Sequence, residues 1–235
     1  MLRLIIDTAL GYMGIGVATD AGVLASAVVA SPVTITTLGA KTVDFLLRAS
    51  GHDRKELLEV AVSAGPGTFT SLRAGISLAK GIGMGLDVPI VPVSTLDAMA
   101  DTVRQGDGYL AAAIDGKNDN IYLAVYGLRP GAAEKVVPDT LIKAVGAAAG
   151  CPKVLRQHPV RLIGFGVERY KGFLTGICTR IETWDRLEPD RMIGSLNRIA
   201  SQRLYSAVPC PAVTFAPVYL RLPDVNKKNG RPGLL

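Results

Sequence analysis

Short apolar runs and longer apolar stretches alternate along the first hundred residues. Three runs at the start are separated by turn-prone segments, which predicts an antiparallel meander. After Pro32, apolar positions recur at helical spacing as far as Gly51, a residue that favours helix termination. The expected elements are strands at 2–7, 12–19 and 23–30, a helix at 37–49, a strand at 57–64, a helix at 70–86, a strand at 88–93 and a helix at 94–104.

The segment 109–127 repeats the pattern of the amino terminus. In both places an apolar strand ends in Ile-Asp, a tight turn follows, and a second alternating strand begins. The paired aspartates are Asp7 and Asp115. We therefore expect an α/β chain of two lobes, the second a truncated copy of the first. Beyond the repeat the pattern predicts strands at 160–166, 176–184 and 218–223 and a helix at 189–205.

The helix at 70–86 contains four glycines, although a glycine in a helix interior costs about 1 kcal/mol relative to alanine. One apolar face suffices to pack a helix on its own sheet, and this helix has two. We expect the second face to approach another helix closely, because small residues permit it. The alternative is a helix enclosed within its own domain. The second face consists of Ser71, Gly75, Leu78, Ile82 and Gly85.

The sequence GPGTFT stands between a predicted strand and this helix, where backbone N–H groups can receive an anion. It lacks the G-x-x-x-x-G-K-[ST] phosphate loop, and Thr70 stands where the dinucleotide fingerprint has its third glycine. A helix capped by Thr68 or Thr70 is the simpler interpretation.

Composition is that of a globular protein, with 49% hydrophobic and 20% charged residues. No run of eighteen uncharged apolar residues occurs, so we expect a cytoplasmic protein without a membrane segment. The three cysteines are widely spaced, and His52 and His158 stand apart, which argues against a zinc or other metal site. The formal charge of +6 would suit a protein that works near RNA, but it is a weak signal.

Four separated motifs, in order, resemble the TsaB (YeaZ) family of bacterial proteins of tRNA threonylcarbamoyladenosine synthesis. They are LIIDTA, the stretch from GPGTFT to STLDAMA, AAIDGKNDNIYLAVY and APVYLR. The resemblance implies an actin-like ATPase (ASKHA, RNase H-like) fold with a reduced second lobe. We place the first lobe at 1–104 plus 212–235 and the second at 105–211.

The resemblance also implies a role and partners. The family is a non-catalytic relative of TsaD, the subunit that modifies adenosine 37 of tRNAs reading codons that begin with A. It supports TsaD as a heterodimer that the ATPase TsaE joins, and it touches tRNA only through the complex. The expected contact is a helical bundle formed with the first two helices. We assign it to Leu38, Thr42, Phe45, Ser71, Gly75, Leu78, Ile82 and Gly85, and we expect a homodimer when TsaD is absent.

The alternative is a small actin-like kinase or ATPase that acts alone, with Asp7 and Asp115 around a magnesium phosphate. Against it, GFGVERY is a thin candidate for an adenosine site, and no paired-histidine metal motif is present. The chain also departs from the family. Ser71 replaces a usual glycine, and GKNDN replaces Ala-Arg-Met-Gly-Glu after Asp115. We expect no cofactor of the chain's own, with a nucleotide shared at the complex interface as an open alternative. A peptidase is discounted, because no activated Ser-His or Cys-His pair is evident.

Overall fold

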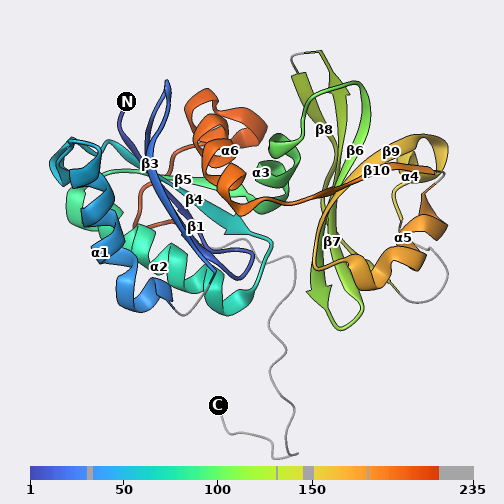
Figure 1. Cartoon of the computed structure of the whole chain (residues 1–235), viewed down its shortest axis with the longest axis horizontal. Coiled ribbons are helices and arrows are strands. Elements are labelled where there is room, and N and C mark those ends of the chain that lie inside the picture. Colours follow the sequence, from blue (N-terminus) through green and yellow to red (C-terminus); the bar gives the residue numbers. More distant parts are fainter. Residues whose placement is uncertain (31–33, 131, 145–150, 179, 217–235) are drawn as a thin grey trace, which may run out of the picture.

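The computed structural model describes residues 1–30, 34–130, 132–144, 151–178 and 180–216. Two five-stranded sheets form two lobes side by side (Figure 1). The first sheet has the order β3-β2-β1-β4-β5 and the second the order β10-β9-β6-β7-β8. The predicted strand at 218–223 lies outside the described residues.

The first lobe follows the predicted alternation of strands and helices. The meander and the first two helices begin and end within a few residues of the predicted positions, so these elements are confirmed. The elements are β1 (Arg3–Asp7), β2 (Met13–Thr19), β3 (Gly22–Val29), α1 (Thr34–Ala49), a 3-10 turn η1 (Arg54–Glu56), β4 (Glu59–Gly65), α2 (Phe69–Leu86), β5 (Ile90–Ser94) and α3 (Thr95–Thr102).

The second lobe contains more structure than the pattern predicts. The strand β8 contains charged residues and Pro138. An edge strand tolerates a proline because the N–H groups on its outer side have no hydrogen-bond partner in the sheet. The end of α5 occupies the start of the strand predicted at 176–184, so β10 begins only at Arg180. The elements are β6 (Gly108–Lys117), β7 (Asn120–Arg129), β8 (Ala132–Lys143), α4 (Val154–Gln157), β9 (Pro159–Phe165), η2 (Glu168–Tyr170), α5 (Lys171–Ile177), β10 (Arg180–Arg186), α6 (Pro189–Gln202) and η3 (Leu204–Ser206).

The two sheets have the same topology, which confirms the internal repeat. In each sheet the first strand pairs antiparallel with the second and parallel with the fourth: β1 with β2 and β4, and β6 with β7 and β9. The second lobe is reduced, because its described helices are short: α4 has 4 residues and α5 has 7, against 16 and 18 in α1 and α2. This is the α/β, actin-like architecture expected from the sequence.

Helices cover both faces of the first sheet. On one face, α1 and α2 pack over Leu4, Ile6 and the inward side chains of β2. On the other face lies α6, drawn in orange in Figure 1. The predicted division placed 189–205 with the second lobe, whereas α6 packs on the first sheet. The reason is a close fit, because Ile193 lies over two glycines of β2, Gly14 and Gly16, where a Cβ atom would lie 3.1 and 2.5 Å from it. We therefore assign α6 to the first lobe.

One of the hydrophobic clusters continues from the first sheet to the second. It contains Ile5 and Val91 of the first sheet, Leu96 of α3, and Leu110 and Ile163 of the second sheet. The helix α3 lies between the two sheets, as Figure 1 shows. In the parts of the chain that the structure describes, no helix is both long enough and apolar enough to cross a bilayer.

Candidate functional site

The loop between β4 and α2 packs closely on the end of β1. The peptide bond between Gly65 and Pro66 is cis, and a Cβ atom on Gly67 would overlap the carbonyl oxygen of Ala9. That same oxygen accepts a hydrogen bond from the backbone N–H of Thr68 at 2.8 Å. The Thr68 amide is therefore engaged within the chain. Of the two predicted capping residues, Thr68 occupies the N-cap position and Thr70 lies inside the helix, but the Thr68 side chain makes no capping hydrogen bond, so the predicted side-chain cap is wrong.

Two of the expected partner residues on α2, Ser71 and Gly75, face their own sheet. Both are buried, and the hydroxyl of Thr8 donates to the carbonyl oxygen of Ser71 at 2.7 Å. A Cβ atom on Gly75 would lie 3.0 Å from the Thr8 methyl carbon and closer still to the Thr8 hydroxyl oxygen. The assignment of Ser71 and Gly75 to a partner contact is therefore corrected: they let α2 approach β1.

The other three glycines of α2 fall into a buried group and an exposed group. Gly83 is buried, and a Cβ atom there would lie 2.9 Å from the Cβ of Ala212. Gly81 and Gly85 are exposed, and no described atom outside their surroundings in the helix lies within 4 Å of a Cβ placed on either. Only these two glycines leave the helix backbone open to a partner.

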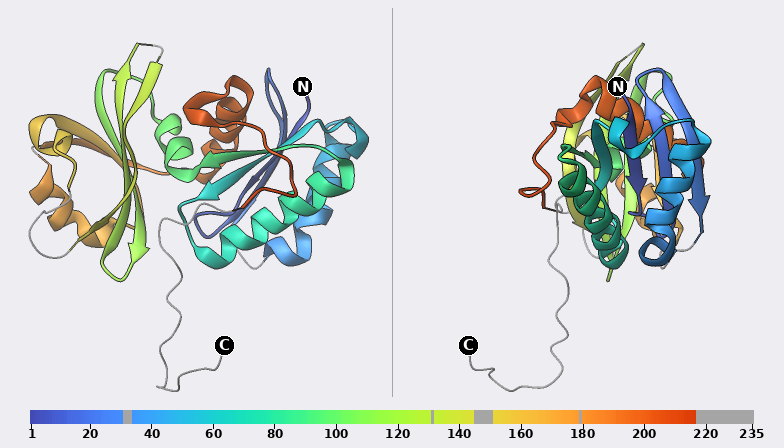
Figure 2. Two further views of the ribbon diagram at one scale, coloured as in Figure 1. Left: turned by 180° about the vertical axis from the view of Figure 1, so that it is seen from behind. Right: turned by 90° about the vertical axis from the view of Figure 1, so that its left-hand side faces the viewer.

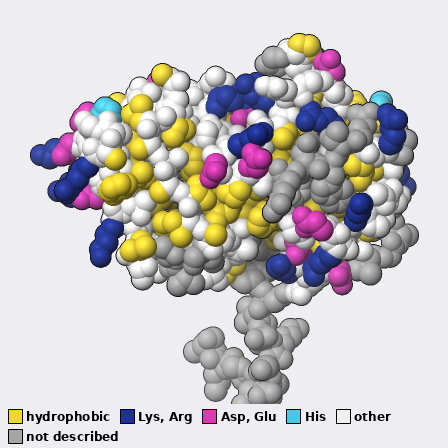
Figure 3. Space-filling model, in the orientation of Figure 1, with side chains coloured by type: hydrophobic (Ala, Val, Ile, Leu, Met, Phe, Trp, Pro, Cys, Tyr) yellow, Lys and Arg dark blue, Asp and Glu magenta, His cyan; other side chains and the backbone are white. Residues whose placement is uncertain are grey.

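The remaining expected contact residues lie on the outer side of α1 and α2. Phe45 and Leu38 of α1 are 67% and 44% exposed. Leu78 and Ile82 of α2 are half-buried, and Leu78 lies against Gly39, where a Cβ atom would be 2.9 Å away. Hydrophobic side chains gather over this part of the surface in Figure 3. We call the surface of Leu38, Thr42, Phe45, Leu78, Gly81, Ile82 and Gly85 the α1–α2 face.

The sequence did not identify a strap, residues 208–216, that crosses the carboxyl end of α2. Cys210 exchanges backbone hydrogen bonds with Ile90 of β5, and Lys80 donates from Nζ to the carbonyl oxygen of Phe215 at 2.8 Å. Figure 2 shows this red segment returning from α6 toward α2. The only sequence signal was the proline-rich run VPCPAVTFAP.

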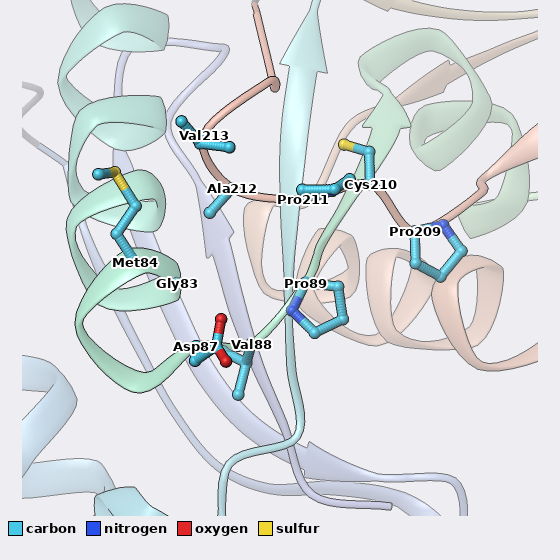
Figure 4. A pocket seen from close by; sticks show the side chains of 10 residues that line it. All are labelled: Gly83, Met84, Asp87, Val88, Pro89, Pro209, Cys210, Pro211, Ala212 and Val213. Atoms are coloured by element: carbon cyan, nitrogen blue, oxygen red, sulfur yellow. The ribbon is translucent and has the colours of Figure 1, made fainter.

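Between the strap and the end of α2 lies an open pocket of about 470 Å³ (Figure 4). Its walls are mainly apolar, with Met84 on the helix side and Val213 on the strap side. Met84 is 59% exposed. The lining residues are Gly83, Met84, Asp87, Val88, Pro89, Pro209, Cys210, Pro211, Ala212 and Val213.

Asp7, the first candidate carboxylate, is fully buried at the end of β1. The Tyr12 hydroxyl donates to its Oδ2 and the Ala9 backbone N–H to its Oδ1 at 3.2 Å. Burial raises the pKa of Asp7, against the opposing effect of hydrogen bonds from Tyr12, Ser63 and Ala9. Each oxygen of the Asp7 carboxyl therefore already accepts a hydrogen bond from within the chain.

Asp115, the second candidate, lies at the end of β6 in the other lobe. Lys117 Nζ contacts its Oδ2 at 2.9 Å, and Arg169 contacts its Oδ1 at 3.1 Å. Burial opposes the change, but the hydrogen bonds from Lys117 and the nearby Arg169 lower the pKa of Asp115 overall. Asp7 and Asp115 share no hydrogen-bond partner among the contacts of the described residues.

The histidines are also engaged elsewhere. His52 Nδ1 lies 2.9 Å from Glu56 Oε2, and the His158 ring packs on Tyr109 with centroids 4.7 Å apart. Among the described residues, no group of three or more His, Cys, Asp and Glu side chains is placed to hold a metal ion.

Comparisons with known proteins identify relatives of this chain. The family model described as "TsaD: tRNA N6-adenosine threonylcarbamoyltransferase" matches residues 38–160, more than half of the chain. The tRNA threonylcarbamoyladenosine biosynthesis protein TsaB of Bacillus subtilis is 31% identical over 59% of this chain and 61% of its own length. TsaB of Escherichia coli is 36% identical over 34% of this chain and 36% of its own length. The matches thus span between about a third and two thirds of these relatives.

A solved structure shows the same fold over nearly the whole chain. YeaZ from Pseudomonas aeruginosa superposes with a TM-score of 0.73 at 24% identity, covering 93% of this chain and 99% of that one. With the family model and the TsaB relatives, this agrees with the motifs found in the sequence. The chain belongs to the family that the TsaD model describes and, within it, to the TsaB (YeaZ) group.

Proposed function

We propose that this protein is a non-catalytic partner subunit in the synthesis of threonylcarbamoyladenosine on tRNA, and that it binds TsaD through the α1–α2 face. The observation that carries the proposal is that Phe45 and Leu38 are exposed on α1 and that Gly81 and Gly85 are open on α2, a helix that contacts α1. Exposed apolar side chains next to a bare helix backbone suit helix-to-helix packing. The names of the TsaB relatives support the pathway, and the TsaD family match supports a partner of related fold.

The non-catalytic role is supported by the two carboxylates that an actin-like kinase would need. Tyr12 engages Asp7, and Lys117 and Arg169 engage Asp115. A magnesium phosphate would have to displace these groups. We propose that TsaE joins the complex through TsaD and this subunit, that tRNA is contacted through the complex, and that any nucleotide is shared at the interface rather than held by this chain alone.

A matched pair of leucines tests the partner surface. Leu38→Glu places a charge on the α1–α2 face, whereas Leu58→Glu places the same charge at a similarly exposed leucine, 54% exposed, outside that face. A desolvated, unpaired charge at a helix contact costs about 1–3 kcal/mol or more, a loss of affinity on the order of tenfold to hundredfold. We expect Leu38→Glu, but not Leu58→Glu, to abolish co-purification with TsaD of the same organism. Equal binding by both variants would refute the proposed surface.

Activity assays separate the proposal from the kinase or ATPase alternative. The purified chain should neither hydrolyse ATP nor transfer threonylcarbamoyl above a buffer blank, and it should increase modification when added to TsaD and TsaE. ATP turnover by the chain alone that disappears in Asp7→Ala would establish the alternative.

A further inference from the structure

The helix α3 is buried on all sides between the two lobes. Every residue from Thr95 to Asp101 is buried, and the helix packs against α6, β4 and β5 of the first lobe and β6 and β7 of the second. Two of these buried residues, Asp97 and Asp101, have carboxyl side chains. Asp101 is paired within the first lobe, where the guanidinium of Arg198 donates from Nε to its Oδ2 at 3.0 Å. Asp97 instead binds groups of the second lobe.

Asp97 receives two contacts across the lobe boundary. The Tyr126 hydroxyl of β7 donates to Asp97 Oδ1 at 2.7 Å, and Lys135 Nζ of β8 lies 2.5 Å from the same oxygen. The Lys135 ammonium also lies 5.7 Å from the centre of the Tyr126 ring. A buried carboxylate needs a paired cation or several donors, because desolvation disfavours its charge. In this structure those groups come from the other lobe.

A second chain of contacts joins the same lysine to the start of α3. Lys135 Nζ also contacts Asp139 Oδ1 at 2.7 Å, and Asp139 Oδ2 accepts a hydrogen bond from Ser94 Oγ at 2.7 Å. Ser94 is the N-cap of α3, and its Oγ accepts from the Asp97 backbone N–H. Lys135 therefore lies between two carboxylates, one from each lobe, and both connections end on the first turn of α3.

We propose that Lys135 locks the second lobe onto α3, so that the two lobes move as one rigid body. Proteins built of two lobes around a cleft commonly open and close by hinge motion. Here the boundary contains a continuous core and the ion pair of Lys135 with Asp97. Removal of the Lys135 ammonium leaves Asp97 buried without its cation and facing Asp139. Loss of the cation therefore destabilises the joined arrangement relative to arrangements in which these carboxylates reach water, and it broadens the distribution of interlobe distances although the shared core remains. This inference does not depend on the proposed partner.

The test is the distribution of interlobe distances, measured by pulsed electron spin resonance. Spin labels are placed at exposed positions 41 on α1 and 171 on α5 through a genetically encoded ketone residue, so that the native cysteines stay unchanged. Lys135→Met keeps most of the side-chain stem and removes the ammonium. Lys143→Met makes the same change at the exposed far end of β8 and is the matched control.

We expect one narrow distance peak in the wild type and in Lys143→Met, and loss of that narrow peak in Lys135→Met. The double variant Lys135→Met, Asp97→Asn should recover the narrow peak, because the amide oxygen still accepts from Tyr126 and no unpaired charge is buried at position 97. An unchanged narrow peak in Lys135→Met, or a double variant that stays broad, would overturn the proposal. If circular dichroism shows that Lys135→Met does not fold, Lys135→Gln is judged by the same criterion.

Discussion

Thr8, which directly follows β1, packs against Gly75 of α2. The Thr8 hydroxyl donates to the Ser71 carbonyl one turn earlier in α2, and a Cβ atom on Gly75 would meet the Thr8 side chain. The glycine is therefore required by the chain's own packing, although it reduces helix propensity.

Gly75→Ala should destabilise the fold by about 1–3 kcal/mol, because the added methyl overlaps Thr8. The double variant Thr8→Ala, Gly75→Ala should recover part of that loss. Gly81→Ala, where a Cβ atom would meet no described atom within 4 Å outside its surroundings in the helix, is the control and should be stabilising by up to about 1 kcal/mol. Urea unfolding measures all three. A Gly75→Ala variant as stable as Gly81→Ala would show that α2 does not pack on Thr8.

Lys80→Met should release the strap. Its ammonium holds the carbonyl oxygen of Phe215, and a hydrogen bond of this kind contributes about 1 kcal/mol. We expect limited proteolysis to cleave between residues 208 and 216 faster than in the wild type, with only a small change in the melting temperature. Lys41→Met on the exposed side of α1 is the control. Equal cleavage of the two variants would indicate that the Lys80 contact does not hold the strap.

Asp7→Asn should change how stability depends on pH. Burial raises the pKa of Asp7 above its ordinary value of 3.8, so the folded state favours the protonated carboxyl. The stability that this proton contributes is complete below the ordinary value and is lost as the pH rises through the folded-state pKa. An amide cannot ionise. Melting temperatures between about pH 4 and pH 8 should therefore shift in favour of Asp7→Asn as the pH rises. A difference that stays constant with pH would contradict the shift.

The α1–α2 face should also mediate self-association when TsaD is absent, because an exposed apolar surface is costly in water. Light scattering at rising protein concentration should show a dimer for the wild type and a monomer for Phe45→Glu, whose side chain is 67% exposed. Adding TsaD should displace the dimer. A wild type that stays monomeric at high concentration would argue against this surface.

The sequence alone determined the order of most elements and the family. Periodic apolar positions and glycine-marked ends are local properties, so the meander, α1 and α2 could be predicted to within a few residues. The repeated Ile-Asp pattern likewise predicted two sheets of the same topology. The second-lobe strand β8 was missed, because Pro138 and its charged residues weaken the strand pattern.

Only the tertiary structure decided which face of α2 meets which neighbour. The two apolar faces of a helix cannot be told apart in a sequence. The residues that distinguish them here, Thr8 and Ala212, are far from α2 along the chain and are brought to it by the sheet and the strap. For that reason Ser71 and Gly75 were assigned to a partner and proved internal, while the exposure of Leu38 and Phe45 agrees with the expected face. The contacts of Lys135 could not be predicted either, because Asp97 and Asp139 come from different lobes and only the fold brings both to the same ammonium.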